Sequence, residues 1–166
     1  MAFGINMTPY QVNVAAEAFV AVIFSQAGYD VAMQYGTTQP DWDILVTKDT
    51  RTLKLQVKGS QDGGWGLFQS YISNANYHGA LDAWLAVQLP DVIYCLVQFF
   101  DVPVGGSPRY YIARPSEMIE HMRTTRGGHA YTSLRENYAY SKGIGAGHTD
   151  IIPIGWLASQ SRIDEI

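Results

Sequence analysis

An almost uninterrupted apolar run, VIYCLVQFF, begins at Val92 and predicts a β-strand over residues 93–100. Side chains of a strand alternate between two faces. A run whose only polar member is Gln98 therefore has no face suited to water, and both of its faces must be covered. Helices on the two sides of a sheet are a common cover, so this run favours an α/β fold.

Helical patterns occur where such a fold needs them. Thr8 and Pro9 form a good helix start, apolar residues then recur at helical spacing as far as Ala27, and Gly28 ends the segment. The residues Pro115-Ser116-Glu117 begin another helix. Helices are predicted over 8–27, 74–89, 115–123 and 156–165.

Further strands are predicted between these helices, at 29–35, 42–48, 52–58, 66–73 and 109–113. The turn Lys48–Arg51 joins two of them, and 109–113 is expected to pair with the apolar run as a hairpin. The order is helix, strands, helix, strands, helix, which predicts a mixed α/β fold with a central sheet. The length of 166 residues suits one domain, 1–166.

Polar residues are spaced along the segment PDWDILVTKDTRTLKLQVKGS, which otherwise resembles a buried hairpin. Asp41 and Asp43 share one face of its first strand, and Lys54, Gln56 and Lys58 share one face of its second. A connecting loop with an even number of residues would place Asp43 opposite Gln56 or Lys58 on a common face. An odd loop would put them on opposite faces.

A cluster of this kind has a chemical use. A carboxylate, a side-chain carbonyl and a backbone carbonyl are hard oxygen donors that suit Mg²⁺. A nearby lysine can orient a water molecule or steady a phosphate, and the ion can activate that water and polarise a phosphodiester.

Glu17 on the first helix, PDWD at 40–43 and QVK at 56–58 together resemble the PD-(D/E)XK nuclease superfamily, which includes restriction enzymes and Holliday junction resolvases. The resemblance implies a restriction-endonuclease-like fold with a central mixed β-sheet flanked by helices. It covers a core of about residues 8–114, with 115–166 as a C-terminal extension. It also implies an endonuclease that hydrolyses DNA with Mg²⁺ or Mn²⁺, and it is compatible with a homodimer because two strands need cutting.

Carried over by position, the catalytic residues are Glu17, Asp43, Gln56 and Lys58, and the metal ligands are Asp43, Gln56, the Val57 carbonyl and Glu17. Asp41 is the rival to Asp43, which is preferred because it abuts the apolar run Ile44–Val46. Gln56 departs from the family pattern, where Asp or Glu is usual, although the resemblance includes a branch with glutamine.

Two other functions remain open. The chain can be a catalytically inactive nuclease-fold module that binds nucleic acid or a protein partner, as Gln56 and the overall acidity suggest. It can also be an immunity or adaptor protein with a chance motif, in which case the carboxylates of Glu17 and Asp43 should lie well apart.

The segment 121–149 is locally basic and rich in tyrosine. Arg123, Arg126, Arg135 and Lys142 are candidate nucleic-acid contacts, and Tyr131, Tyr138 and Tyr140 are candidate stacking surfaces for bases. A polar surface loop with packed tyrosines explains the pattern equally well. The glycines of GIGAG (143–147) lack the lysine and hydroxyl residue that end a phosphate-binding loop, and nucleotide binding there is not expected.

Bulk properties narrow the class of protein. A formal charge of -4 and a pI near 5.4 argue against a strongly basic nucleic-acid coat protein but leave room for a local basic patch. The single cysteine, Cys95, lies in the apolar run and is expected to be a buried core residue. No secretion signal or membrane span is apparent, so a cytoplasmic location is expected.

Overall fold

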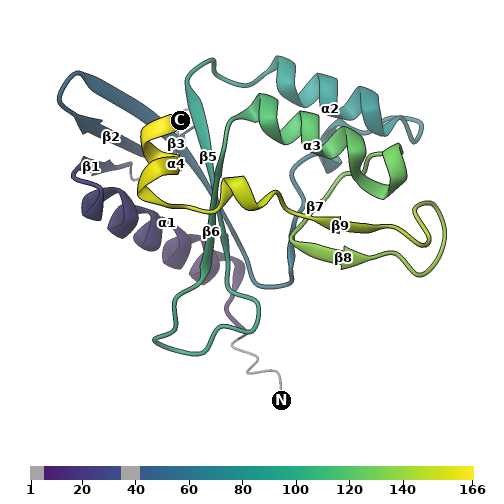
Figure 1. Cartoon of the computed structure of the whole chain (residues 1–166), viewed down its shortest axis with the longest axis horizontal. Helices are drawn as coiled ribbons and strands as arrows, with labels where there is room; N and C mark the ends of the chain where they lie inside the picture. Colours follow the sequence, from purple (N-terminus) through teal and green to yellow (C-terminus); the bar gives the residue numbers. More distant parts are fainter. Residues whose placement is uncertain (1–5, 35–41) are drawn as a thin grey trace.

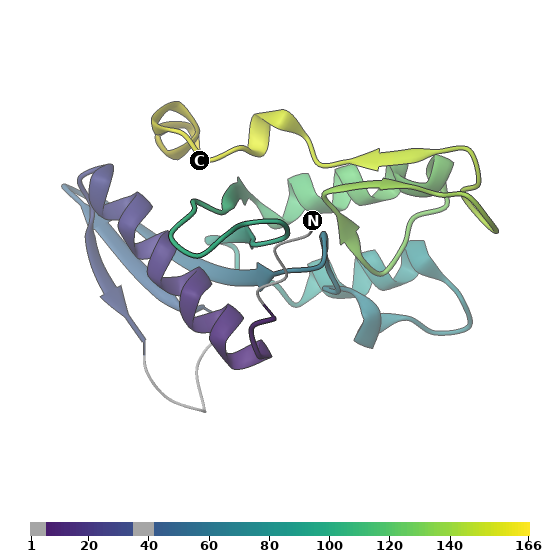
Figure 2. The same cartoon turned by 90° about the horizontal axis from the view of Figure 1, so that it is seen from below.

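The computed structural model describes residues 6–34 and 42–166, which build a mixed α/β fold (Figures 1 and 2). Its central sheet has the strand order β1-β2-β3-β5-β6. The strands are β1 (Asp30–Met33), β2 (Ile44–Lys48), β3 (Arg51–Ser60), β5 (Val92–Gln98) and β6 (Arg109–Ala113). Strands β3 and β5 run parallel and the other pairs antiparallel, so the sheet is mixed.

In the described part of the chain, four helices accompany the sheet: α1 (Pro9–Gln26), α2 (Tyr77–Ala86), α3 (Pro115–Gly128) and α4 (Gln160–Glu165). In Figure 1, α1 lies on one side of the sheet, and α2 and α3 lie together on the other. The Thr8 side chain and Gln11 form a capping box that fixes the start of α1. The predicted helices are therefore present, each with somewhat different bounds.

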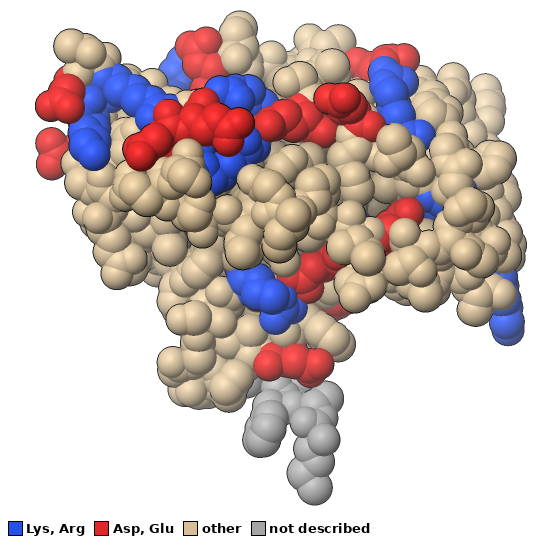
Figure 3. All heavy atoms as spheres, in the orientation of Figure 1, with Lys and Arg blue, Asp and Glu red and all other residues tan. Residues whose placement is uncertain are grey.

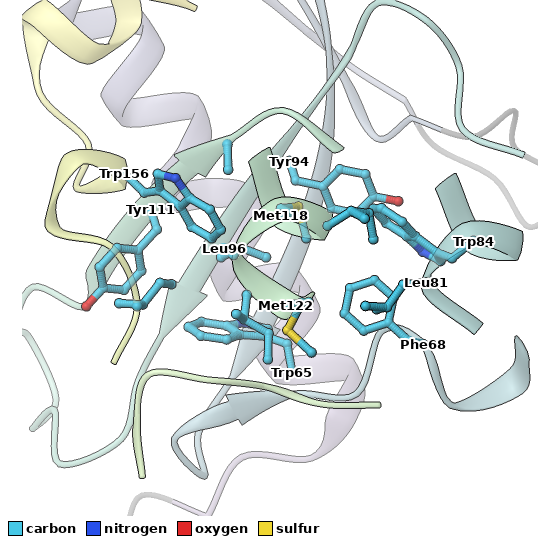
Figure 4. Close-up of a cluster of buried hydrophobic side chains, with 14 of the residues drawn as sticks. Trp65, Phe68, Leu81, Trp84, Tyr94, Leu96, Tyr111, Met118, Met122 and Trp156 are labelled. Atoms are coloured by element: carbon cyan, nitrogen blue, oxygen red, sulfur yellow. The ribbon is translucent and has the colours of Figure 1, made fainter. Parts of the chain in front are cut away.

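Two hydrophobic clusters fill the space on the two sides of the sheet. One contains residues of α1, α4 and odd-numbered residues of β5, including Phe24, Ile93 and Cys95. The other, drawn in Figure 4, contains residues of α2, α3 and even-numbered residues of β5, including Trp84 and Leu96. All seven residues of β5 are buried, as the apolar run predicts. Cys95 is a core residue, and burial raises the pKa of its thiol.

The prediction of a strand over 66–73 is wrong. A short strand β4 (Gly64–Trp65) ends just before this segment, and the segment itself contains a 3₁₀ turn η1 (Gln69–Tyr71). Strand β4 leaves the central sheet and pairs with β7 (Leu134–Arg135). The Phe68 ring is fully buried against Trp84, so this segment serves to fill the core beneath α2 rather than to extend the sheet.

The weakly patterned segment 124–150 contains more regular structure than its composition suggests. Strands β8 (Asn137–Ala139) and β9 (Thr149–Ile151) form an antiparallel hairpin, which projects at the end of the molecule away from α1 (Figures 1 and 2). The glycine-rich segment 143–147 lies in its turn, where Gly143, Gly145 and Gly147 all have positive φ. A 3₁₀ turn η2 (Ile154–Trp156) then leads to α4.

The edge strand β6 does not face solvent along its whole length. Tyr111 forms a bridge with Leu157, and the Ala158 backbone N–H donates to the Tyr110 carbonyl at 2.9 Å. The C-terminal segment thereby covers part of an edge that could otherwise pair with another chain. No helix in the described part of the chain has the length and apolar character to cross a lipid bilayer.

Candidate functional site

A two-residue turn sets the register on which the site depends. Asp49 and Thr50 join β2 to β3, and Asp49 has a φ of 52°. The antiparallel register pairs Ile44 with Leu55, so the residue before Ile44 reaches Gln56. An even loop is one of the two alternatives that the sequence left open, and it is the one that places Asp43 near Gln56.

Asp43 lies just before β2 and closes the end of the β2–β3 pair. Its N–H donates to the Leu55 carbonyl at 2.7 Å. Its Oδ2 accepts from the Val57 N–H at 2.7 Å and from the Gln56 Nε2 at 2.8 Å. The Asp43 carboxylate thus accepts the Val57 N–H at a place beyond Ile44–Leu55, the last regular pair of the two strands. The hydrogen bonds from Val57 and Gln56 fix the position of the Asp43 side chain.

The side chains of Gln56 and Lys58 lie on the face of β3 opposite to those of Leu55 and Val57. Leu55 and Val57 point into the cluster beneath α1, and strand alternation places Gln56 and Lys58 on the other face. The amide of Gln56 presents its NH₂ group to Asp43 in this structure. Rotation of the amide would exchange its nitrogen and oxygen, so the same side chain can offer an oxygen to a cation beside Asp43.

Glu17 lies on α1, the helix that packs over the Leu55 and Val57 face of the sheet. Burial raises the pKa of Glu17, the negative charge of Asp43 raises it further, and the positive charge of Lys58 opposes both. Asp43 and Lys58 therefore both act on the charge of Glu17. The expectation that the carboxylates of Glu17 and Asp43 lie well apart, which belongs to the chance-motif alternative, stays a prediction.

Lys58 lies at the edge of a groove of about 330 Å³. The groove is lined from α1 by Pro9 and Asn13 and from the β3–β4 connection by Asp62 and Gly64. The Trp65 indole N–H donates to the Lys58 carbonyl at 3.0 Å and holds the backbone of this lysine in place. An extended ligand that lies in this groove would pass the Lys58 side chain.

Gly59 is a site residue that the sequence patterns did not reveal. A Cβ atom at this position would lie 2.7 Å from Val12 Cγ1 and 2.9 Å from the Val12 carbonyl oxygen. Only glycine therefore allows α1 to lie this close to β3, one residue beyond Lys58. The glycine of QVKG in the sequence was the available signal, but a β-strand glycine has several common explanations.

The donors at this site suit a hard cation but are not all carboxylates. Glu17 and Asp43 supply carboxylate oxygens, Gln56 supplies an amide oxygen after rotation, and Val57 supplies a backbone carbonyl. Within residues 6–34 and 42–166, no three His, Cys, Asp or Glu side chains gather closely enough to hold a metal ion. A cation here would thus depend on the amide and carbonyl oxygens. Asp41, the rival ligand, lies outside the described residues.

Two of the four basic candidates in the segment 121–149 are engaged in the fold. Arg123 forms an exposed ion pair with Asp82 of α2. Arg126 is only 7% exposed, and its guanidinium donates to the carbonyls of Ile144 and Ala130. Both arginines therefore have structural roles: Arg123 joins α3 to α2, and Arg126 joins α3 to the loops at residues 130 and 144.

The other two basic candidates lie near solvent by the β8–β9 hairpin. Arg135 is partly exposed and stacks on the Tyr138 ring, with 5.0 Å between its Cζ and the ring centroid. Lys142 is exposed. On the face drawn in Figure 3, basic and acidic side chains are intermixed and gather mainly along the upper edge, so that face has no broad basic field.

No protein-family model matches the chain, and no curated protein matches it significantly. The function is therefore argued from the residues and their arrangement.

Proposed function

We propose that the protein is a metal-dependent endonuclease with a restriction-endonuclease-like fold that hydrolyses phosphodiester bonds of DNA. The observation that carries the proposal is the contact of the Asp43 carboxylate with Gln56 and the Val57 backbone. The charges of Asp43 and Lys58 both act on Glu17. This contact and these charge effects support an assignment of the four residues to one D…QxK site.

The order of the elements supports the same proposal. Helix α1 is followed by the antiparallel strands β1, β2 and β3, and then by α2 and the parallel strand β5. This is the sequence of elements that the resemblance to PD-(D/E)XK nucleases implies. The motif residues lie at the end of β2–β3 pairing, beside the groove lined by Lys58.

Asp43, Gln56, the Val57 carbonyl and Glu17 would hold Mg²⁺ or Mn²⁺. When bound, the ion would withdraw charge from the phosphodiester and lower the pKa of a bound water molecule. Hydrolysis adds the water oxygen to phosphorus, and the bridging oxygen leaves and takes up a proton. The Lys58 ammonium can hold the attacking water or a phosphate oxygen by hydrogen bonds and offset the negative charge that develops there.

Glu17 has a second use in this scheme. If Glu17 binds the ion through a water molecule rather than directly, its carboxylate can accept a proton from that water. A carboxylate of this kind near the attacking water favours removal of the water's proton. The test of the proposal is DNA cleavage in the presence of Mg²⁺ or Mn²⁺ that Lys58→Ala abolishes; equal cleavage by that variant would refute the role of Lys58.

A catalytically inactive module that binds nucleic acid is the second candidate. Gln56 favours it, because an amide oxygen is a weaker Mg²⁺ ligand than a carboxylate and the described residues hold no cluster of three acidic or other metal-binding side chains. Calorimetric titration with Mg²⁺ separates the two candidates. Binding that disappears in Asp43→Ala supports the enzyme, and no binding to the unaltered protein supports the module.

A further inference from the structure

A second hollow is lined by residues from the C-terminal end of α3, from β7 and from the β8–β9 hairpin. Its volume is about 250 Å³. Three basic and three aromatic side chains line it, and we call it the tyrosine pocket: Arg126, Tyr131, Arg135, Tyr138, Tyr140 and Lys142.

The cations of the tyrosine pocket exceed the acids that face it. Asp150 is the buried acid beside it, and its carboxylate accepts from the Arg126 backbone N–H at 3.0 Å and from the Tyr140 hydroxyl at 2.8 Å. Glu136 is next in sequence to Arg135 but binds Arg109 and Tyr111 instead. Arg126 is held by backbone carbonyls, so among the described residues of the pocket Arg135 and Lys142 are the cations left for a ligand, and they favour an anionic one.

Arg135 holds an unused hydrogen-bond donor at this place. Its Nε is buried and has no hydrogen-bond partner within the described ranges 6–34 and 42–166. A buried donor without a partner costs free energy. Because the Nε atom itself is covered, a phosphate would reach Arg135 through the rest of its guanidinium fork, which matches phosphate geometry well.

The aromatic side chains give the tyrosine pocket a second kind of contact. Arg126 lies over the Tyr131 ring, with 4.5 Å between its Cζ and the ring centroid. Tyr138 remains 44% exposed even though Arg135 lies over its ring, and it meets Tyr140 edge-on at a centroid distance of 4.8 Å. Flat apolar surface next to cations suits a ligand that is both aromatic and anionic.

The tyrosine pocket adjoins the groove beside Lys58. Gly64 lines that groove, and Arg135 lines the tyrosine pocket; the two residues are register partners in the β4–β7 pair. A Cβ atom on Gly64 would lie 3.2 Å from Arg135 Nη1. One guanidinium thus lies between the two hollows, and an extended chain that occupies the groove can reach the tyrosine pocket past Arg135.

We propose that the tyrosine pocket binds a nucleotide unit, with the phosphate on Arg135 and Lys142 and the base stacked on Tyr138. A duplex buries its bases, so the pocket can take a base only from an unpaired strand or from a free nucleotide. The proposal is independent of cleavage, since none of the pocket residues belongs to the Asp43 site. If the proposed function also holds, the substrate carries an unpaired segment next to the bond that is cut.

The test is binding of a fluorescently labelled single-stranded oligodeoxynucleotide in EDTA, followed by fluorescence anisotropy, with unlabelled duplex and mononucleotide as competitors. Tyr138→Ala should weaken binding about 5- to 100-fold, the range expected for loss of one stacked base. Tyr138→Phe keeps the ring and should bind as the unaltered protein does. Lys142→Ala should reduce the slope of log K against log salt concentration by about 0.7, the value for one phosphate contact in a single strand. Lys54→Ala is the control and should leave this slope unchanged, because Lys54 lies on β3 and lines neither hollow.

If the duplex does not displace the labelled single strand, the base comes from an unpaired strand. Displacement by the mononucleotide at similar concentration shows that the pocket also takes a free nucleotide, and both results support the pocket. Equal binding by Tyr138→Ala and Tyr138→Phe, or no binding of the labelled single strand, overturns it. Asp43→Ala should leave this binding unchanged in EDTA while it abolishes cleavage, so failure of the pocket and failure of the proposed function give different results.

Discussion

The Asp43 carboxylate binds the backbone of Val57: Oδ2 accepts the Val57 N–H at 2.7 Å, fourteen residues along the chain. This bond joins the start of β2 to the middle of β3 at the point where regular pairing of the two strands ends. The residue proposed to hold the metal thus also has a structural role, and the two roles can be separated by substitution.

Asp43→Ala is expected to lower the free energy of unfolding by about 1–3 kcal/mol, because it leaves the N–H of the buried Val57 without its acceptor. Asp43→Asn keeps an oxygen acceptor and should cost less. Urea denaturation of both variants measures the difference. If the alanine variant is as stable as the unaltered protein, the Asp43–Val57 bond does not contribute to the fold as described.

Gln56→Glu should destabilise the metal-free protein, because it replaces a donor to Asp43 with a second negative charge. The same change supplies the carboxylate usual in the family. Mg²⁺ should then restore stability, by about 2.7 kcal/mol when its concentration is a hundred times its Kd. Thermal unfolding with and without Mg²⁺ checks this, with Gln56→Ala as the control that should gain nothing. If Mg²⁺ does not change the thermal stability of Gln56→Glu, the side-chain oxygens at positions 43 and 56 do not bind one ion.

Gly59→Ala should destabilise the protein by about 1–3 kcal/mol, since the added methyl group overlaps Val12 and forces α1 away from β3. Gly155→Ala is a matched control, because a Cβ atom added at Gly155 would have no neighbouring atom within 4 Å. Because Glu17 lies on α1, Gly59→Ala should also reduce cleavage more than its effect on stability explains. Equal stability of the two alanine variants would show that the close approach is not required.

The stability of the protein should fall as the pH is lowered through the range where histidine titrates. Burial lowers the pKa of His121 below its ordinary value of 6.5, although the charge of Asp150 opposes the shift. The unfolded state then binds the proton more readily than the folded state does. The contribution of neutral His121 to the free energy of unfolding is therefore fully present above about pH 6.5, and it is lost as the pH falls through the pKa of the folded state.

His121→Phe removes the titrating group and keeps a ring that can meet Trp156 edge-on, as His121 does at 5.4 Å. Its free energy of unfolding should vary less between pH 7 and pH 5 than that of the unaltered protein, in denaturant titrations at each pH. His129→Phe is the control, because His129 is exposed. An identical pH dependence in His121→Phe and the unaltered protein would contradict the assignment.

The sequence predicted the central elements because their patterns are local. The apolar run became β5, the strand at 109–113 became β6 with the same bounds, and the capping residues Thr8 and Pro9 placed the start of α1. The contact of Asp43 with Gln56 also followed from alternation along two strands, once the length of the turn was known.

Features that depend on distant partners were not predictable. The segment 66–73 has strand-like residues, but Phe68 is drawn into the core beneath α2, and the tertiary contact outweighs the local preference. Arg126 resembles a solvent-exposed basic residue in sequence, yet carbonyls of residues 130 and 144 surround it. The closeness of Gly59 to Val12 likewise exists only when α1 lies on β3.

Cleavage of DNA in Mg²⁺ by the unaltered protein, Lys58→Ala and Lys54→Ala is the decisive measurement for the proposed nuclease. The two lysines are on the same strand and the same face, but only Lys58 lines the groove and acts on the charge of Glu17. We expect cleavage that depends on Mg²⁺, is retained in Lys54→Ala and falls at least about a hundredfold in Lys58→Ala, as loss of a catalytic group does. Cleavage by Lys58→Ala at the rate of the unaltered protein would be incompatible with the proposed site.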